Sequence, residues 1–134
     1  MPPLLEQRRP VGANLLYHSA VSKSDAVPKR QQEILVKVRE AALKKILYLP
    51  HAARQMARPD RMISPQEVRE AVSSGLVIED YPEDARGHSC LMLGRGDGGK
   101  VIHIVCSPKP DYLAIITAYR PDDQQWSPDY RRRR

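Results

Sequence analysis

Four short apolar runs in the second half of the chain constrain its fold more than any other feature. They are rich in β-branched, aromatic and other apolar residues, and Gly/Pro/Asp-rich turns separate them; they cover residues 76–81, 88–93, 101–106 and 112–119. The clearest link, 94–99, contains four glycines and is typical of a hairpin loop. Because the links are short, the runs predict a four-stranded antiparallel meander with one face packed on helices.

Helical signals precede these runs. Apolar residues recur at helical spacing from Gln31 onward, which predicts a helix over about 30–44. Ser64-Pro65-Gln66-Glu67 forms a capping box with Pro at the first helical position, so a second helix is expected over 65–74, with Gly75 as its C-terminal cap.

Between these helices, the pattern is less decisive. The run 46–49 before Pro50 fits either a brief strand or the last turn of the first helix. Residues 51–56 favour a short helix that carries His51 in its first turn. The whole pattern predicts an α+β fold with two or three N-terminal helices packed on a four-stranded antiparallel sheet.

At 134 residues the chain suits a single domain. The Pro- and Ser-containing segment 1–29 shows no sustained apolar period, so we expect an arm that is poorly ordered or draped on the domain. The α+β domain is expected over 30–126, followed by a basic tail over 127–134. Because such arms often mediate contacts between copies of a chain, a homo-oligomer is also compatible with the sequence.

Charge and composition narrow the function classes. A net charge of +6 favours a polyanionic partner such as RNA, although simple solubility explains it too. No apolar run is long enough for a membrane span or a signal peptide, which predicts a cytoplasmic protein. Cys90 and Cys106 lie in strand-like runs and are expected to behave as small hydrophobes. The His and Cys residues lack the spacing of zinc ligands, so neither a metal nor another cofactor is expected.

Several local motifs carry a resemblance to a family. His51-Ala52, the stretch LVIEDYPED at 76–84, GRGDGGKVIHIV at 94–105 and IITAYRPDDQQW at 115–126 resemble small bacterial toxins similar to MqsR and, more remotely, to RelE and HigB. The resemblance implies a RelE-like, barnase-type architecture and a type II toxin that cleaves RNA without a metal, using the RNA 2′-hydroxyl as the nucleophile. It also implies an antitoxin partner, of the zinc-finger type in many such pairs.

Such a reaction needs a proton acceptor, a cation on the phosphate and a proton donor. The candidate catalytic residues are His51, Tyr119, Arg120 and His103. His103 alternates with apolar neighbours on one strand face, so a hydrogen-bonded core histidine is the competing interpretation. Tyr119 and Arg120 are adjacent strand residues and are expected to point to opposite faces, unless the strand bends before Pro121.

Further cationic and aromatic residues are candidates for holding RNA. The candidate RNA contacts are Arg54, Arg58, Arg61, Tyr81, Lys100 and Arg131. For each arginine alone, an ordinary solvated charge is the competing interpretation. Two other functions remain open at this point: a non-catalytic module that binds RNA or protein, and a protein with a structural or assembly role.

Overall fold

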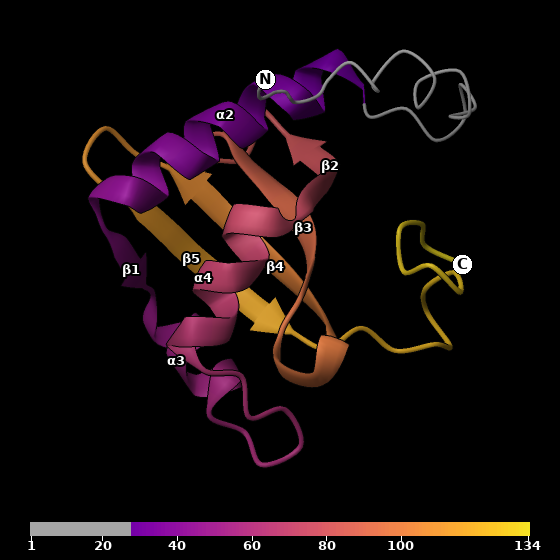
Figure 1. The fold of residues 1–134 in the computed structure, drawn as a ribbon. Helices are drawn as coiled ribbons and strands as arrows, with labels where there is room; N and C mark the ends of the chain where they lie inside the picture. The colour runs from indigo at the N-terminus through magenta and orange to yellow at the C-terminus, as the bar shows by residue number, and fades with distance from the viewer. Residues whose placement is uncertain (1–27) are drawn as a thin grey trace, which may run out of the picture.

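The computed structural model describes residues 28–134, in which helices and a single sheet form an α+β fold (Figure 1). All but the last two residues of the predicted arm 1–29 lie outside this described part. The elements follow the order α2 (Lys29–Lys44), β1 (Ile46–Tyr48), α3 (Pro50–Met56), α4 (Pro65–Ser74), β2 (Leu76–Tyr81), β3 (Ser89–Arg95), the short 3₁₀ turn η2 (Asp97–Gly99), β4 (Val101–Pro108) and β5 (Leu113–Tyr119). The helix predictions over 30–44, 51–56 and 65–74 are confirmed to within a residue.

The sheet has five strands in the order β1-β5-β4-β3-β2. Strands β2 to β5 form the predicted antiparallel meander, but β1 pairs in parallel with β5. The prediction of a four-stranded, purely antiparallel sheet is therefore wrong: the sheet is mixed, and a strand separates the first helix from the other two. The extra strand has only three residues, and its partner residues 113–115 lie far along the chain, so no local pattern distinguishes it from a helix end.

The capping box sets the position and the start of α4. The Ser64 hydroxyl accepts a hydrogen bond from the Glu67 backbone N–H at 3.1 Å, and the Glu67 carboxylate accepts one from the Ser64 N–H at 3.1 Å. These bonds satisfy two backbone donors that a helix otherwise leaves unpaired, a contribution of about 1 kcal/mol for such a cap. As a result, Glu67 is held at the end of the helix that lies nearest to the end of β5.

Gly75 ends α4, as predicted, but it does not adopt the left-handed conformation that is common after helices. Its backbone is extended, and a side chain there would collide with the carbonyl oxygens of Ala71 and Leu93. Close approach of backbones, rather than a positive φ, therefore requires glycine. The Arg39 guanidinium binds the carbonyls of Val72 and Gly75 at 3.2 and 2.7 Å, which satisfies acceptors at this helix end.

Helices α2 and α4 lie across one face of the sheet (Figure 1), and the main core fills the space between them and the strands. Along β4 the side chains of Ile102, Ile104 and Cys106 join this core, whereas His103 points to the opposite face. Cys106 pairs in register with Cys90, and both are free and fully buried. The alternation of side chains along β4 thus gives an apolar side toward the helices and an opposite side that carries His103.

After β5, residues 121–134 form a looped segment that returns toward the sheet. Trp126 forms an isolated antiparallel bridge with Arg133, and the Ser127 N–H donates to the Arg132 carbonyl at 2.8 Å. Trp126 is 3% exposed, so its side chain anchors the C-terminal segment to the domain. In the described part of the chain, no helix has the length and apolar character required to cross a membrane.

Candidate functional site

The sheet face opposite the helices holds a buried histidine within a cluster of polar and aromatic groups. His103 is 0% exposed, and its Nδ1 lies 3.2 Å from the Tyr119 hydroxyl. Its Nε2 lies 2.8 Å from the backbone carbonyl oxygen of Tyr130. The ring of Trp126 packs edge-on against the imidazole at 4.4 Å between ring centroids. Two strands and the C-terminal segment therefore meet at one imidazole.

These contacts determine the tautomer of His103. The Tyr130 carbonyl can only accept a hydrogen bond, so Nε2 carries the proton and donates it. In the neutral ring Nδ1 is then an acceptor, and the Tyr119 hydroxyl donates to it. Burial lowers the pKa of His103, although the Tyr130 carbonyl and the Glu79 charge oppose this effect. The imidazole is therefore neutral at pH 7.

Tyr119 is the more accessible member of this pair. It is half-buried at the end of β5, and burial raises its pKa above the ordinary value, with a further increase from the Glu79 charge. The positive charges of Arg133 and Arg61 act on the hydroxyl in the opposite direction. Tyr119 therefore keeps its proton at neutral pH while cationic groups favour its ionised form.

Glu79 and Arg133 complete the cluster. We call it the His103–Tyr119 site; its members are His103, Tyr119, Glu79, Tyr81, Trp126 and Arg133. Arg133 binds the Glu79 carboxylate through two N–H groups at 2.9 and 3.0 Å, and its guanidinium lies 4.7 Å from the centre of the Trp126 ring. The Tyr81 hydroxyl donates a short hydrogen bond to the same carboxylate. Burial, together with this bond, raises the pKa of Tyr81 to about 12, whereas Arg133 and Tyr81 outweigh burial and lower that of Glu79.

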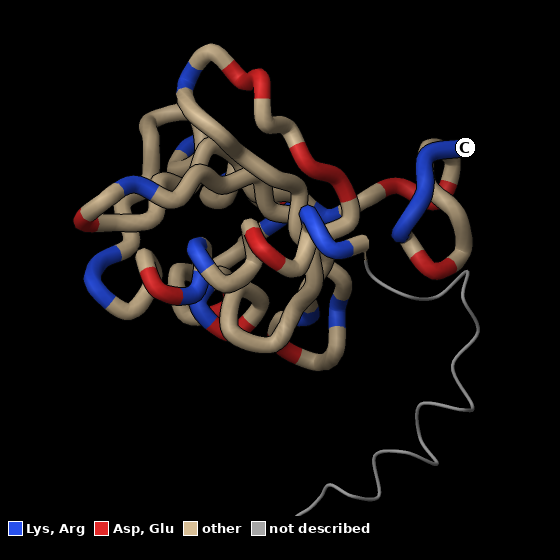
Figure 2. Tube along the Cα trace, turned by 90° about the horizontal axis from the view of Figure 1, so that it is seen from above, with Lys and Arg blue, Asp and Glu red and all other residues tan. Residues whose placement is uncertain are grey.

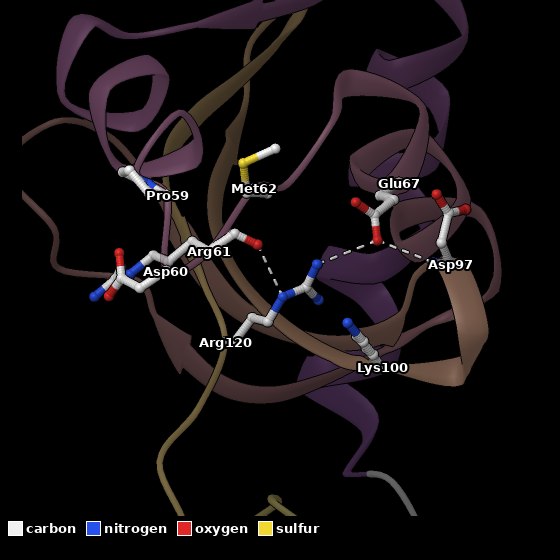
Figure 3. Close-up of a pocket in the computed structure, with 8 residues that line it drawn as sticks. All are labelled: Pro59, Asp60, Arg61, Met62, Glu67, Asp97, Lys100 and Arg120. Carbon is white, nitrogen blue, oxygen red and sulfur yellow. Dashed lines mark hydrogen bonds and ion pairs between the residues drawn. The ribbon is translucent and has the colours of Figure 1, made fainter.

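Arg120 lies on the other side of the sheet, next to the N-terminus of α4. Its Nε donates to the Arg61 carbonyl at 3.0 Å, and one terminal nitrogen binds the Glu67 carboxylate at 3.4 Å (Figure 3). Glu67 also accepts from the Asp97 backbone N–H at 2.9 Å. Burial tends to raise the pKa of Glu67, but the N–H groups of Ser64 and Asp97, with Arg120, outweigh it and keep Glu67 ionised.

The structure brings together two of the four candidate catalytic residues, His103 and Tyr119. It places Arg120 on the opposite face, as expected for adjacent strand positions. His51 is exposed at the start of α3, and no hydrogen bond or ion pair within the described residues joins it to Tyr119 or Arg120. The histidine that contacts the Tyr119 hydroxyl is His103, from the neighbouring strand β4.

The candidate RNA contacts are dispersed rather than gathered at one site. Arg54 is exposed at the end of α3, Arg58 is bound to Asp60 at 3.2 Å, and the backbone N–H of Arg131 binds Asp129. The other three lie near one of the two faces described above: Arg61 and Lys100 line the pocket of Figure 3, and Tyr81 belongs to the His103–Tyr119 site.

Two members of the site, Glu79 and Arg133, are not among the candidates that the sequence predicts. Their ion pair joins positions 54 residues apart, and a bulge between Val77 and Glu79 turns Glu79 away from the helices. The only available signal was that Glu79 and Tyr81 share one face of a strand, which the bulge leaves intact.

Within residues 28–134, no three His, Cys, Asp or Glu side chains gather in an arrangement that could hold a metal ion. What the geometry does provide is a hydrogen-bonded Tyr–His pair beside a Glu–Arg ion pair. Such an arrangement can transfer protons and attract an anion, and it defines a mixed α+β domain with a polar site on the sheet face opposite the helices.

Comparison with known proteins gives this domain a family. A family model described as a domain of unknown function (DUF4258) matches residues 48–120, which is more than half of the chain, and the chain therefore belongs to that family. The matched segment contains Tyr119, His103 and Arg120 but not the C-terminal segment. No curated protein and no solved structure matches the chain.

Proposed function

We propose that this protein is a metal-independent endoribonuclease that acts in the cytoplasm. The observation that carries the proposal is the hydrogen bond from the Tyr119 hydroxyl to the neutral, buried imidazole of His103. A hydroxyl that donates to a neutral imidazole can give up its proton as it receives another one. Because His103 is fully buried, Tyr119 is the catalytic residue and His103 the positioning residue behind it.

In the proposed reaction, the 2′-oxygen of a ribose attacks the adjacent phosphorus. Its proton passes to the Tyr119 oxygen while the Tyr119 proton moves to Nδ1 of His103. The bond between phosphorus and the 5′-oxygen then breaks, and Tyr119 protonates the leaving oxygen as it recovers its own proton from the imidazolium. The products are a 2′,3′-cyclic phosphate and a 5′-hydroxyl, and the Tyr–His pair returns to its starting state.

Cationic groups near Tyr119 support the same chemistry. The charges of Arg133 and Arg61 both act on the Tyr119 hydroxyl, which favours the build-up of negative charge there and on a phosphate beside it. Arg133 is 62% exposed at its side chain and therefore accessible to a ligand. Lys and Arg are interspersed with acidic residues along the trace (Figure 2), and the chain carries a net charge of +6, which favours an RNA partner.

The test is RNA cleavage by the purified protein in the presence of EDTA. Removal of the Tyr119 hydroxyl by Tyr119→Phe is expected to lower the rate about 10²–10⁴-fold, the usual effect of one positioned proton-transfer group. Tyr112→Phe is the matched control, because Tyr112 precedes the other end of β5 and its hydroxyl makes no hydrogen bond to a described residue. Equal rates for wild type and Tyr119→Phe, or no cleavage of any RNA pool by wild type, contradict the proposal.

A second candidate function is a non-catalytic module that binds RNA or a protein. The observation in its favour is that both nitrogens of His103 are occupied and the ring is fully buried, as in a core histidine with a structural role. Such a module binds RNA with an affinity that falls with salt, by a log–log slope of about −0.7 per phosphate neutralised on single strands, but leaves the RNA intact. Intact RNA after binding therefore separates the two candidates.

The resemblance to RelE-like and MqsR-like proteins extends the proposal to a type II toxin held inactive by an antitoxin, of the zinc-finger type in many such pairs. Induced production of the wild-type protein is then expected to arrest growth of a bacterial host, and Tyr119→Phe to leave growth normal. Growth arrest by both proteins at equal levels contradicts this role. The toxin role depends on the cleavage activity, whereas the cleavage activity does not depend on the toxin role.

A further inference from the structure

A pocket on the helix side of the sheet lies beyond the His103–Tyr119 site. It has a volume of about 390 Å³ and is bounded by the α3–α4 loop, the N-terminus of α4 and the β3–β4 turn (Figure 3). Its charged residues include Arg120, Lys100, Glu67 and Asp97. This volume is within the range of sites for small ligands, about 300–1,000 Å³.

Arg120 is held rigidly in this pocket and still lacks one partner. Its Nε and one terminal nitrogen are bound by the Arg61 carbonyl and by Glu67. The other terminal nitrogen, Nη1, is buried and makes no hydrogen bond, and within residues 28–134 it is the one buried side-chain nitrogen or oxygen in this condition. A buried N–H group without an acceptor is unfavourable, so a ligand that supplies an acceptor is bound more tightly.

Lys100 adds a second positive charge at the same place. Its ammonium group points toward the Arg120 guanidinium in Figure 3, and it forms no ion pair with a carboxylate of the described residues. Two like charges that converge repel each other unless an anion lies between them. The arrangement of Lys100 and Arg120 is therefore one that an anion would stabilise.

Glu67 pairs with Arg120, but none of the pocket carboxylates lies between Arg120 and Lys100 in Figure 3. Glu67 accepts hydrogen bonds from two backbone N–H groups as well as from Arg120, so its oxygens are occupied. Asp60 is bound to Arg58 at 3.2 Å. The Asp97 carboxylate points away from the Lys100 ammonium in Figure 3. Glycine at position 96 lets the β3–β4 turn approach Glu67, since a side chain there would collide with its carboxylate.

We infer that this pocket binds a phosphate-type oxyanion between the Arg120 Nη1 group and the Lys100 ammonium. Arginine offers planar N–H donors that suit phosphate oxygens, and lysine supplies a mobile point charge. Two sources share this chemistry: a phosphate of a nucleic-acid backbone, and free phosphate or a phosphorylated small molecule. The site is separate from the His103–Tyr119 site, because Tyr119 and Arg120 point to opposite faces of the sheet.

The test follows the Nε–H resonances of the arginines in the full chain by NMR. One titration adds inorganic phosphate, and a separate one adds a short single-stranded DNA, which has no 2′-hydroxyl and cannot be cleaved through it. Both ligands are expected to shift the Arg120 resonance. Lys100→Gln is expected to weaken phosphate binding about 5–10-fold, as for the loss of one charged contact at an exposed position. Lys37→Gln, at an exposed position on α2, is the matched control and should bind as wild type does.

The phosphate and DNA titrations distinguish a free anion from a nucleic-acid phosphate, and they test this site independently of the proposed cleavage. A shift of Arg120 by DNA that phosphate then reverses identifies a backbone phosphate as one occupant of the site, whereas a shift by phosphate alone identifies a small anion. Tyr119→Phe is expected to bind both ligands as wild type does, so loss of cleavage and loss of this site are independent results. If neither ligand shifts Arg120, or if Lys37→Gln weakens binding as much as Lys100→Gln, the inference is wrong.

Discussion

At the end of β5, the adjacent residues Tyr119 and Arg120 lie on opposite faces of the sheet and belong to two different kinds of polar pair. On the face opposite the helices, Tyr119 and His103 form a neutral pair whose protons can move. On the helix side, Arg120 and Glu67 form an ion pair, and the pKa of Glu67 is lowered. The alternation of a single strand thus separates a hydrogen-bonded Tyr–His pair from an ion pair, although Tyr119 and Arg120 are neighbours in the chain.

The two regions also differ in what holds them together. The Arg120–Glu67 pair rests on the capping box of α4 and on the β3–β4 turn, and the Glu67 side chain is almost fully buried. The His103–Tyr119 site depends on the C-terminal segment, whose Arg133 binds Glu79 at an exposed position. We therefore expect changes on the helix side to affect stability, and changes on the opposite face to affect the rate of cleavage.

The largest expected effect concerns the histidine. His103→Gln keeps a side chain of similar length but cannot take up a proton, so cleavage should fall about 10²-fold or more. Wild-type activity requires neutral His103 and should decline only as the pH falls through the lowered pKa of this histidine, below the ordinary value of about 6.5, whereas the residual activity of the variant should lack this decline. His88→Gln, at a half-buried position where the ring is bound to Asp80 at 2.5 Å, is the control. An acid decline that persists in His103→Gln contradicts the assignment.

The next prediction compares the two carboxylates in urea denaturation. Glu67→Ala removes half of the capping box and leaves Arg120 without its counter-charge, so the free energy of unfolding should fall by about 2–3 kcal/mol. Glu79→Ala removes a pair whose arginine is 62% exposed and should lower it by about 1 kcal/mol or less. Equal losses for the two variants would remove the contrast between the faces.

Stability against acid sharpens the same contrast. The pKa of His103 is lowered in the folded protein, so the unfolded chain binds the proton more readily. This contribution to stability is complete above the unfolded pKa near 6.5 and is lost as the pH falls through the lowered folded pKa. The free energy of unfolding measured from pH 7.5 down to 5 should therefore decline less in His103→Gln than in wild type. A parallel decline in both proteins contradicts the burial of a neutral imidazole.

The smallest effect is expected from the exposed arginine. Arg133→Gln breaks the ion pair with Glu79 at a position open to solvent, and the free energy of unfolding should change by less than about 1 kcal/mol. Cleavage should nevertheless slow, because the charge that acts on Tyr119 is gone. Arg132→Gln, the adjacent exposed position, is the control for both measurements. A change in stability without a change in rate would assign Arg133 a purely structural role.

Much of the fold follows from local patterns in the chain. The capping box at Ser64 and the apolar runs of the meander act over a few residues, and the structure confirms both. The parallel strand β1 escaped prediction because three residues carry no periodicity and their partners in β5 lie far away in the sequence. Short-range patterns therefore predicted the helices and the four meander strands, but not the fifth strand at the edge of the sheet.

The candidate site was less predictable for the same reason. Strand alternation separated Tyr119 from Arg120, but for His103 it left two interpretations open, a catalytic residue and a hydrogen-bonded core histidine. It could not show that the C-terminal segment returns to bring Tyr130 and Arg133 beside His103 and Glu79. Those contacts depend on a loop whose path is determined by tertiary packing, above all by the burial of Trp126.

The most direct test of the central claim is the chemistry of the RNA ends after incubation with the protein in EDTA. The proton transfer through Tyr119 and His103 predicts fragments that end in a 2′,3′-cyclic phosphate and begin with a 5′-hydroxyl, formed by wild type and nearly absent with Tyr119→Phe. Fragments that begin with a 5′-phosphate, or the same yield of cyclic ends from both proteins, would contradict a Tyr–His pair acting on the 2′-hydroxyl.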